Sequence, residues 1–213
     1  MSHSCVRILV LLLAAVAIDV ARAGPARCEA TPRLVLLVAV DQLPPDRIDA
    51  DLPGGLGRLT REGRFYTEAA LDHGMTETCA GHATMLTGRH PAHAGIPGNR
   101  FLDLEEGETV YCVADSSADA PVLGGEGGRS PKNLRVSTLG DWMKSAHPAS
   151  RVFSVSGKDR AAVTLAGHSP DAAYWFNATG EVGFTSSGYY MARLPEWVQE
   201  FNGRTPPEDG FLA

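Results

Sequence analysis

An unbroken apolar run at residues 34–40 (LVLLVAV) constrains the fold of this chain more than any other feature. A run rich in Val and Leu, without alternating polar residues, is typical of a strand buried on both faces of a parallel sheet. Asp41 follows it directly. Open α/β sheets bind ligands at the carboxyl ends of their strands, so this position suits a metal ligand. A turn or a helix cap would also explain an aspartate there.

A second feature is the stretch 75–99, MTETCAGHATMLTGRHPAHAGIPGN. Its small residues predict a short helix over 79–87, ended by Gly88, and the Gly/Pro-rich segment 89–98 predicts a loop that leads to Asn99. Thr78 stands at the expected N-cap, where its hydroxyl would lie among unpaired N–H groups that favour an anion such as phosphate. A hydroxyl and an anion site therefore coincide, although a plain helix cap remains the alternative.

Hydrophobic periodicity and turn residues predict further elements along the chain. Strands are expected at 65–71, 109–114 and 151–156, with a hairpin of 172–176 and 181–185. Helices are expected at 56–61, from a cap at Ser137 or Thr138 through Ala146, at 160–165 and at 195–202. The polar segment 116–132 reads as a long loop.

The first 23 residues have the pattern of a secretory signal peptide. Arg7 precedes an apolar run at 8–18 that is too short to span a membrane, and Ala21-Arg22-Ala23 forms a small-x-small cleavage site. We therefore expect a periplasmic or secreted protein, with no membrane contact after cleavage and with residues 24–213 forming the remaining domain.

Charge and cysteine content exclude some functions and leave others open. Without residues 1–23 the chain has 17 basic and 24 acidic side chains, a net charge of −7, which does not indicate nucleic-acid binding. Cys28, Cys79 and Cys112 remain, so one disulfide plus one free thiol is possible, but the spacing does not say which pair forms. Cys79 reads as a small buried packing residue and not as a nucleophile.

Five side chains fall at expected strand ends or at a helix start, and their types fit phosphate-ester hydrolysis. That reaction needs an activated nucleophile, cations that neutralise the phosphoryl oxygens and a donor that orients them. The residues are Asp41, Thr78, Asn99, Lys158 and Arg160.

The chain resembles the alkaline phosphatase superfamily on four segments: VLLVAVDQLPPD, TETCAGHATMLTGRHPAHAGIPGN, SVSGKDRAAVTLAGHSPDAAYWF and LPEWVQEFN. Within it, the chain most resembles the secreted, phosphate-irrepressible, broad-specificity alkaline phosphatases.

The resemblance implies a fold and a role for each residue. The fold would be a three-layer α/β structure with a largely parallel central sheet, of which this chain holds an N-terminal portion. Asp41 would bind zinc, and Thr78 would be the metal-bound nucleophile that is phosphorylated in turnover. Asn99, Lys158 and Arg160 would hold phosphate oxygens, and the substrates would be small phosphate esters.

The K-x-R pair favours a phosphomonoesterase, because a dianionic monoester carries one more charge than a diester. The related phosphodiesterase and nucleotide pyrophosphatase branch is the alternative enzyme. Such enzymes bind two zinc ions largely through an Asp-x-x-x-His, an Asp-His pair and a further His in their later half, and none of these follows Arg160. His82 reads as a helix-packing residue, and His90 and His93 lack the acidic company of a metal site.

We therefore expect the truncated chain to be inactive by itself and a C-terminal half to supply the missing ligands. A non-catalytic phosphate-binding or vestigial module is the alternative from another functional class. It would keep the threonine, asparagine, lysine and arginine but lack zinc.

Overall fold

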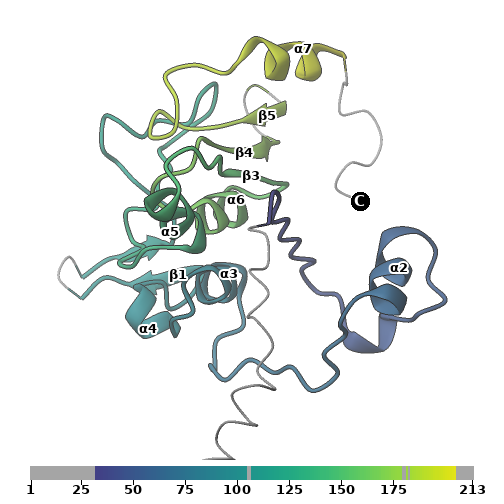
Figure 1. Cartoon of the computed structure of the whole chain (residues 1–213). Helices are drawn as coiled ribbons and strands as arrows, with labels where there is room; N and C mark the ends of the chain where they lie inside the picture. Colours follow the sequence, from purple (N-terminus) through teal and green to yellow (C-terminus); the bar gives the residue numbers. More distant parts are fainter. Residues whose placement is uncertain (1–31, 105–106, 179–180, 182, 205–213) are drawn as a thin grey trace, which may run out of the picture. The chain divides into compact units, whose positions relative to one another are not determined.

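The computed structural model describes residues 32–104, 107–178, 181 and 183–204 (Figure 1). The chain divides into two units, Met1–Ala39 and Val40–Ala213, which are described separately. The predicted signal peptide and Cys28 lie outside the described residues. Within the described residues, no helix has both the length and the apolar character that crossing a membrane requires.

The apolar run that opens the described chain is not a strand, so the prediction of a buried strand at 34–40 is wrong. Its residues have no ladder partner, and Leu34 and Leu36 are 79% and 78% exposed. A buried strand needs neighbouring strands and covering layers, yet every strand of the described structure lies beyond residue 99 and pairs with another of that set. The strand predicted at 65–71 is also wrong, because these residues form an exposed turn and coil segment.

A three-stranded sheet confirms the α/β class. Strands β3 (Phe153–Ser156), β4 (Ala172–Asn177) and β5 (Gly183–Thr185) lie in the order β3-β4-β5. The β3–β4 pair is parallel, as expected for a β-α-β crossover, and β4 and β5 form the predicted antiparallel hairpin. Helix α6 (Asp159–Ala166) makes the crossover and packs on β3 and β4.

Two helices rich in small residues form the core beneath the site. Helix α3 (Thr78–Thr87) packs against α6, and the alanines of both helices are buried, which lets the two backbones approach closely. Gly88 ends α3 in the left-handed conformation at φ 61°, as its position in the sequence predicts. Cys79, in the first turn of α3, is buried as expected. A disulfide joins it to Cys112.

The remaining elements follow their local signals closely. Helix α5 (Leu139–Ala146) begins with a capping box in which Thr138 and Asp141 exchange hydrogen bonds, which confirms the predicted start. The others are η1 (Pro45–Arg47), α2 (Gly54–Glu62), α4 (Pro91–Ala94), the antiparallel pair β1 (Arg100–Leu102) and β2 (Thr109–Tyr111), and α7 (Glu196–Arg204). The one-turn helix α4 lies inside the segment expected to be loop, where Pro91 supplies a favourable first residue.

Candidate active site

Thr78 and Asp41 are in direct contact. The Thr78 hydroxyl donates a hydrogen bond to Asp41 Oδ2 at 3.2 Å. Thr78 is the first residue of α3, and Glu77 is the N-cap residue, whose side chain makes no hydrogen bond to the first turn. The prediction that Thr78 caps the helix is therefore wrong. The helix begins one residue earlier than the sequence predicts, with Glu77 as the extended N-cap residue. Thr78 is therefore the first helical residue, and its hydroxyl faces the Asp41 carboxylate.

His82 lies one helical turn after Thr78 and contacts the same carboxylate. Its Nε2 is 3.0 Å from Asp41 Oδ1, and the imidazole is almost fully buried. The sequence alone predicts a packing role for His82. The spacing of four residues from Thr78 was the available signal, because residues i and i+4 share one face of a helix. Asp41 thus accepts contacts at both oxygens, while 35% of its side chain stays exposed.

Lys158 and Asp159 follow the end of β3 and start α6. Lys158 is the N-cap residue of α6, and its Nζ lies 3.8 Å from Asp41 Oδ2. The Lys158 side chain is 48% exposed, so the ammonium group remains open to solvent on one side. The structure therefore brings Asp41, Thr78 and Lys158 together near the carboxyl end of β3.

Asn99 is tied to the start of α3 by two hydrogen bonds. Its Oδ1 accepts the N–H of Cys79 at 2.9 Å, and its own backbone N–H donates to Glu77 Oε2 at 2.5 Å. These contacts fix the amide beside the first turn of α3. Within the described residues, Asn99 Nδ2 makes no hydrogen bond, so this donor is available to a ligand.

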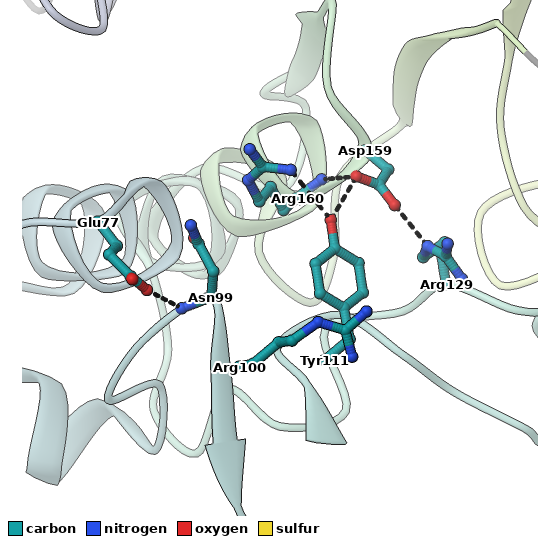
Figure 2. Close-up of a pocket in the computed structure, with 7 residues that line it drawn as sticks. All are labelled: Glu77, Asn99, Arg100, Tyr111, Arg129, Asp159 and Arg160. Carbon is teal, nitrogen blue, oxygen red and sulfur yellow. Dashed lines mark hydrogen bonds and ion pairs between the residues drawn. The ribbon is translucent and has the colours of Figure 1, made fainter. Parts of the chain in front are cut away.

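Asn99 and Arg160 line one cavity of about 510 Å³ (Figure 2). The other lining residues are Glu77, Arg100, Tyr111, Arg129 and Asp159. Two of the five predicted residues thus share this cavity, while Asp41, Thr78 and Lys158 form the neighbouring cluster. The cavity and the cluster are formed by residues that are close in the sequence. Thr78 follows Glu77, and Lys158 is two residues from Arg160.

A hydrogen-bonded network holds Arg160 in the cavity, as Figure 2 shows. The Tyr111 hydroxyl donates to Asp159 Oδ1 at 2.6 Å, and Arg160 Nη1 lies 3.5 Å from the same hydroxyl oxygen. Asp159 Oδ2 accepts from Arg129 Nε at 2.5 Å. Sequence reasoning missed this network, since its members come from a short strand, a long loop and a helix start and share no motif.

Burial, followed by the hydrogen bond to Asp159, raises the pKa of Tyr111 from 10.0 to about 12, against an opposing effect of Arg160. The hydroxyl therefore stays protonated through mildly alkaline pH. It can donate to Asp159 and accept from Arg160 over that whole range.

The described residues do not complete a zinc site. Asp41 and the Thr78 hydroxyl supply two oxygen donors, and a catalytic zinc typically has about three protein ligands. The described part of the chain contains no group of three or more His, Cys, Asp or Glu side chains arranged to hold a metal ion. His90 pairs with Asp72, with Nε2 and Oδ2 3.2 Å apart, and joins no such group.

Comparison with known proteins relates the chain to phosphate-ester hydrolases. The model of the type I phosphodiesterase / nucleotide pyrophosphatase family matches residues 35–211. A protein of Myroides odoratus named calcium-transporting ATPase is 41% identical over 180 residues, which are 80% of this chain and 32% of that protein. Alkaline phosphatase PhoK of Sphingomonas sp is 40% identical over 161 residues, 73% of this chain and 28% of that one. The chain thus spans about a third of the length of these relatives.

A solved structure agrees with the sequence relatives. The crystal structure of wild-type alkaline phosphatase PafA superposes with a TM-score of 0.67 at 36% identity and covers 71% of this chain and 29% of that chain. A second structure of PafA, with a TM-score of 0.59, carries substitutions of one threonine, one asparagine, one lysine and one arginine. The shared α/β fold agrees with the sheet and crossover helix described above.

Proposed function

Because the chain belongs to the type I phosphodiesterase / nucleotide pyrophosphatase family, we propose that it is part of a hydrolase that cleaves phosphate monoesters. The observation that carries this proposal is the contact between Thr78 Oγ1 and Asp41 Oδ2 at 3.2 Å, with Lys158 Nζ 3.8 Å from the same carboxylate oxygen. A hydroxyl, a proton acceptor and a cation thus meet at one point, as phosphoryl transfer requires.

Thr78 is the nucleophile in this proposal. Its Oγ1 attacks phosphorus, the bond to the ester oxygen breaks, and the organic group leaves as an alkoxide that takes a proton from water. Water then hydrolyses the phosphothreonine and restores the hydroxyl. Asp41 is placed to orient the hydroxyl and to attract its proton at Oδ2, while His82 Nε2, 3.0 Å from Oδ1, holds the carboxylate in place.

Asn99, Lys158 and Arg160 bind the phosphoryl oxygens in this proposal. Asn99 offers its amide Nδ2, and the two cations offset the charge of a dianionic ester. The substituted PafA structure supports this assignment. In that enzyme the threonine and asparagine are 21 positions apart and the lysine and arginine two apart, and the pairs Thr78/Asn99 and Lys158/Arg160 have the same spacings.

We also propose that Asp41 and Thr78 contribute oxygen ligands to a zinc site whose other ligands lie outside the described residues. Zinc would lower the pKa of the threonine hydroxyl and balance phosphate charge. Since the described residues supply two donors, a polypeptide of residues 24–213 alone should have negligible turnover even with added zinc. Stoichiometric zinc and turnover in that polypeptide would contradict this expectation.

Cleavage of phosphodiesters is the second candidate function, and the description of the matching family favours it. The cation pair Lys158 and Arg160 favours monoesters, because a diester has one negative charge fewer at phosphorus. The ratio of kcat/KM for 4-nitrophenyl phosphate and bis(4-nitrophenyl) phosphate decides between the two. We expect the monoester to be preferred, and a preference for the diester would reverse the assignment.

Activity of Thr78 variants tests the nucleophile in the protein encoded by the complete gene. Thr78→Ala should abolish hydrolysis of 4-nitrophenyl phosphate, whereas Thr78→Ser should retain part of it because the nucleophilic oxygen remains. Full activity of the alanine variant would mean that water attacks phosphorus directly.

Export to the periplasm or the exterior completes the proposal. The pattern of residues 1–23 and the Cys79–Cys112 disulfide both support it, since structural disulfides persist mainly in oxidising compartments. Fractionation of cells that produce the protein, followed by N-terminal sequencing, should find the mature chain outside the cytoplasm with Gly24 first.

A further inference from the structure

We propose that Arg100 and Tyr111 form a second anion-binding subsite beside the phosphate-binding residues. The preferred substrates are then phosphate monoesters whose organic group carries a second anionic group, such as a carboxylate or another phosphate. This inference rests on the proposed function, since it assigns the substrate class of the same site.

Arg100 and Arg160 lie around one tyrosine in the same cavity (Figure 2). Arg160 Nη1 is 3.5 Å from the Tyr111 hydroxyl oxygen, and Arg100 Cζ is 5.5 Å from the centroid of the Tyr111 ring. The Arg160 guanidinium thus lies at the hydroxyl end of Tyr111, and the Arg100 guanidinium lies near its aromatic ring. A ligand with two anionic groups about one aromatic ring apart can reach both.

Arg100 is the arginine of this cavity that is free to bind such a group. Arg129 also lies over the Tyr111 ring, at 5.3 Å, but its guanidinium is bound to Asp159 Oδ2 and to the carbonyl oxygen of Gly128. Arg100 is exposed, and the described structure places no carboxylate within 4.0 Å of its guanidinium. Contact with the aromatic ring restrains the guanidinium without using its N–H donors.

The charge of the cavity also favours an anion. Three arginines line it, against the two carboxylates of Glu77 and Asp159. Asp159 is already paired with Arg129, and Glu77 accepts the backbone N–H of Asn99. The lining side chains thus carry a net charge of +1, and Arg100 and Arg160, the two cations assigned to the two ends of the substrate, have no carboxylate partner among the described residues.

The cavity adjoins the residues proposed to bind the phosphoryl group, so it can hold the organic group of the ester. In-line displacement puts the leaving group on the side of phosphorus opposite the nucleophile. Asn99 and Arg160, which are proposed to hold the phosphoryl oxygens, line the cavity, whereas Thr78 does not. The organic group of the ester can thus extend from the phosphate site past Tyr111 toward Arg100.

Binding of non-hydrolysable phosphonates tests the subsite without requiring turnover. The ligands are phenylphosphonate and its 3-carboxy and 4-carboxy derivatives, and affinities are measured by calorimetry with the purified protein at low ionic strength. Wild type should bind at least one carboxylated ligand about two- to fivefold more tightly than phenylphosphonate, within the range of an exposed charge pair. Arg100→Met should remove this preference and Arg100→Lys should keep part of it.

Arg58→Met is the matched control, because it removes an exposed arginine from α2 that does not line the cavity. This variant should leave the preference for the carboxylated ligand unchanged. Added salt should weaken the preference of wild type, but should not change the ratio of the two affinities in Arg100→Met. If Arg160→Met weakens all ligands but the carboxylate confers no preference that depends on Arg100, the subsite is overturned and the proposed function stands. If no phosphonate binds to wild type, both fail.

Discussion

Replacing Tyr111 by Phe tests the network that holds Arg160, because it removes one oxygen and keeps the ring that Arg100 and Arg129 both approach. Asp159 Oδ1 loses a 2.6 Å hydrogen bond from the hydroxyl and keeps the one from the backbone N–H of Arg160, while Oδ2 keeps Arg129. A hydrogen bond to a charged group contributes about 1.5–3 kcal/mol to stability. The variant should therefore be less stable than wild type by about 2 kcal/mol at pH 8.

The difference depends on pH in a defined direction. Burial and the bond to Asp159 raise the pKa of Tyr111 from 10.0 to about 12, so the folded state favours the protonated phenol. The stabilisation is complete below pH 10 and is lost as the pH rises from 10 to 12. At 1.36 kcal/mol per unit of pKa the upper limit of the loss is about 2.7 kcal/mol, and solvent screening of this half-buried phenol lowers it to about 1–2 kcal/mol.

Urea denaturation followed by tryptophan fluorescence at pH 8, 10 and 11 measures this difference. Tyr189→Phe is the control, because it also removes a hydroxyl, but one that is bound to the neutral carbonyl oxygen of His168 at 2.9 Å on a residue that is 40% exposed. We expect it to cost about 1 kcal/mol or less. A Tyr111→Phe variant as stable as wild type at pH 8, or a difference that does not shrink by pH 11, would refute the reasoning.

Two further predictions concern the proposed phosphate-binding cations and the start of strand β4. Lys158→Ala or Arg160→Ala should lower kcat/KM for a phosphate monoester by about 30- to 1,000-fold, corresponding to roughly 2–4 kcal/mol, and should lower it less for a matched diester; equal losses would favour a phosphodiesterase. Asp171→Asn should lower the free energy of unfolding at pH 7 by about 1–2 kcal/mol. Asp171 Oδ2 lies 2.9 Å from Lys144 Nζ, and the carboxylate also accepts from Arg151 and from the Val152 N–H. Burial acts to raise the pKa of Asp171, but these bonds hold the pKa well below its usual range. The stabilisation is therefore present above about pH 4 and is lost as the pH falls further, which unfolding curves at several pH values measure. A difference between Asp171→Asn and wild type that persists at pH 2 would count against this pairing.

Local signals predicted much of the fold. The Thr138 cap, the hairpin of β4 and β5 and the Gly88 stop depend on neighbours within a few residues, so the sequence contains their full cause. Local signals do not decide the structure of the run at 34–40, because a strand forms only beside a partner strand. No strand among the described residues pairs with this run. Apolar character alone indicates that a segment needs burial, but not what covers it.

The site was predictable in part for a similar reason. Residues at strand ends and helix starts tend to meet at one end of a sheet, and this holds for Thr78 at the start of α3 and Lys158 at the start of α6. Both contact Asp41, although Asp41 follows no strand in the described structure. Tyr111 and Arg129 contact Asp159 across separations of 48 and 30 residues, and no periodic pattern encodes contacts between a strand, a loop and a helix start. The sequence predicts Thr78 as a helix cap, because capping propensity depends on the local backbone. It does not register a carboxylate 37 residues away.

The most direct measurement of the central claim is whether Thr78 becomes phosphorylated during turnover. The protein encoded by the complete gene is incubated with a phosphate monoester, quenched in acid and digested, and the peptide that contains Thr78 is analysed by mass spectrometry. We predict one added phosphoryl group on Thr78, with none on the equivalent peptide of Thr78→Ala. Monoester turnover that leaves Thr78 unmodified at every quench time, or phosphate found on another residue, would contradict the account.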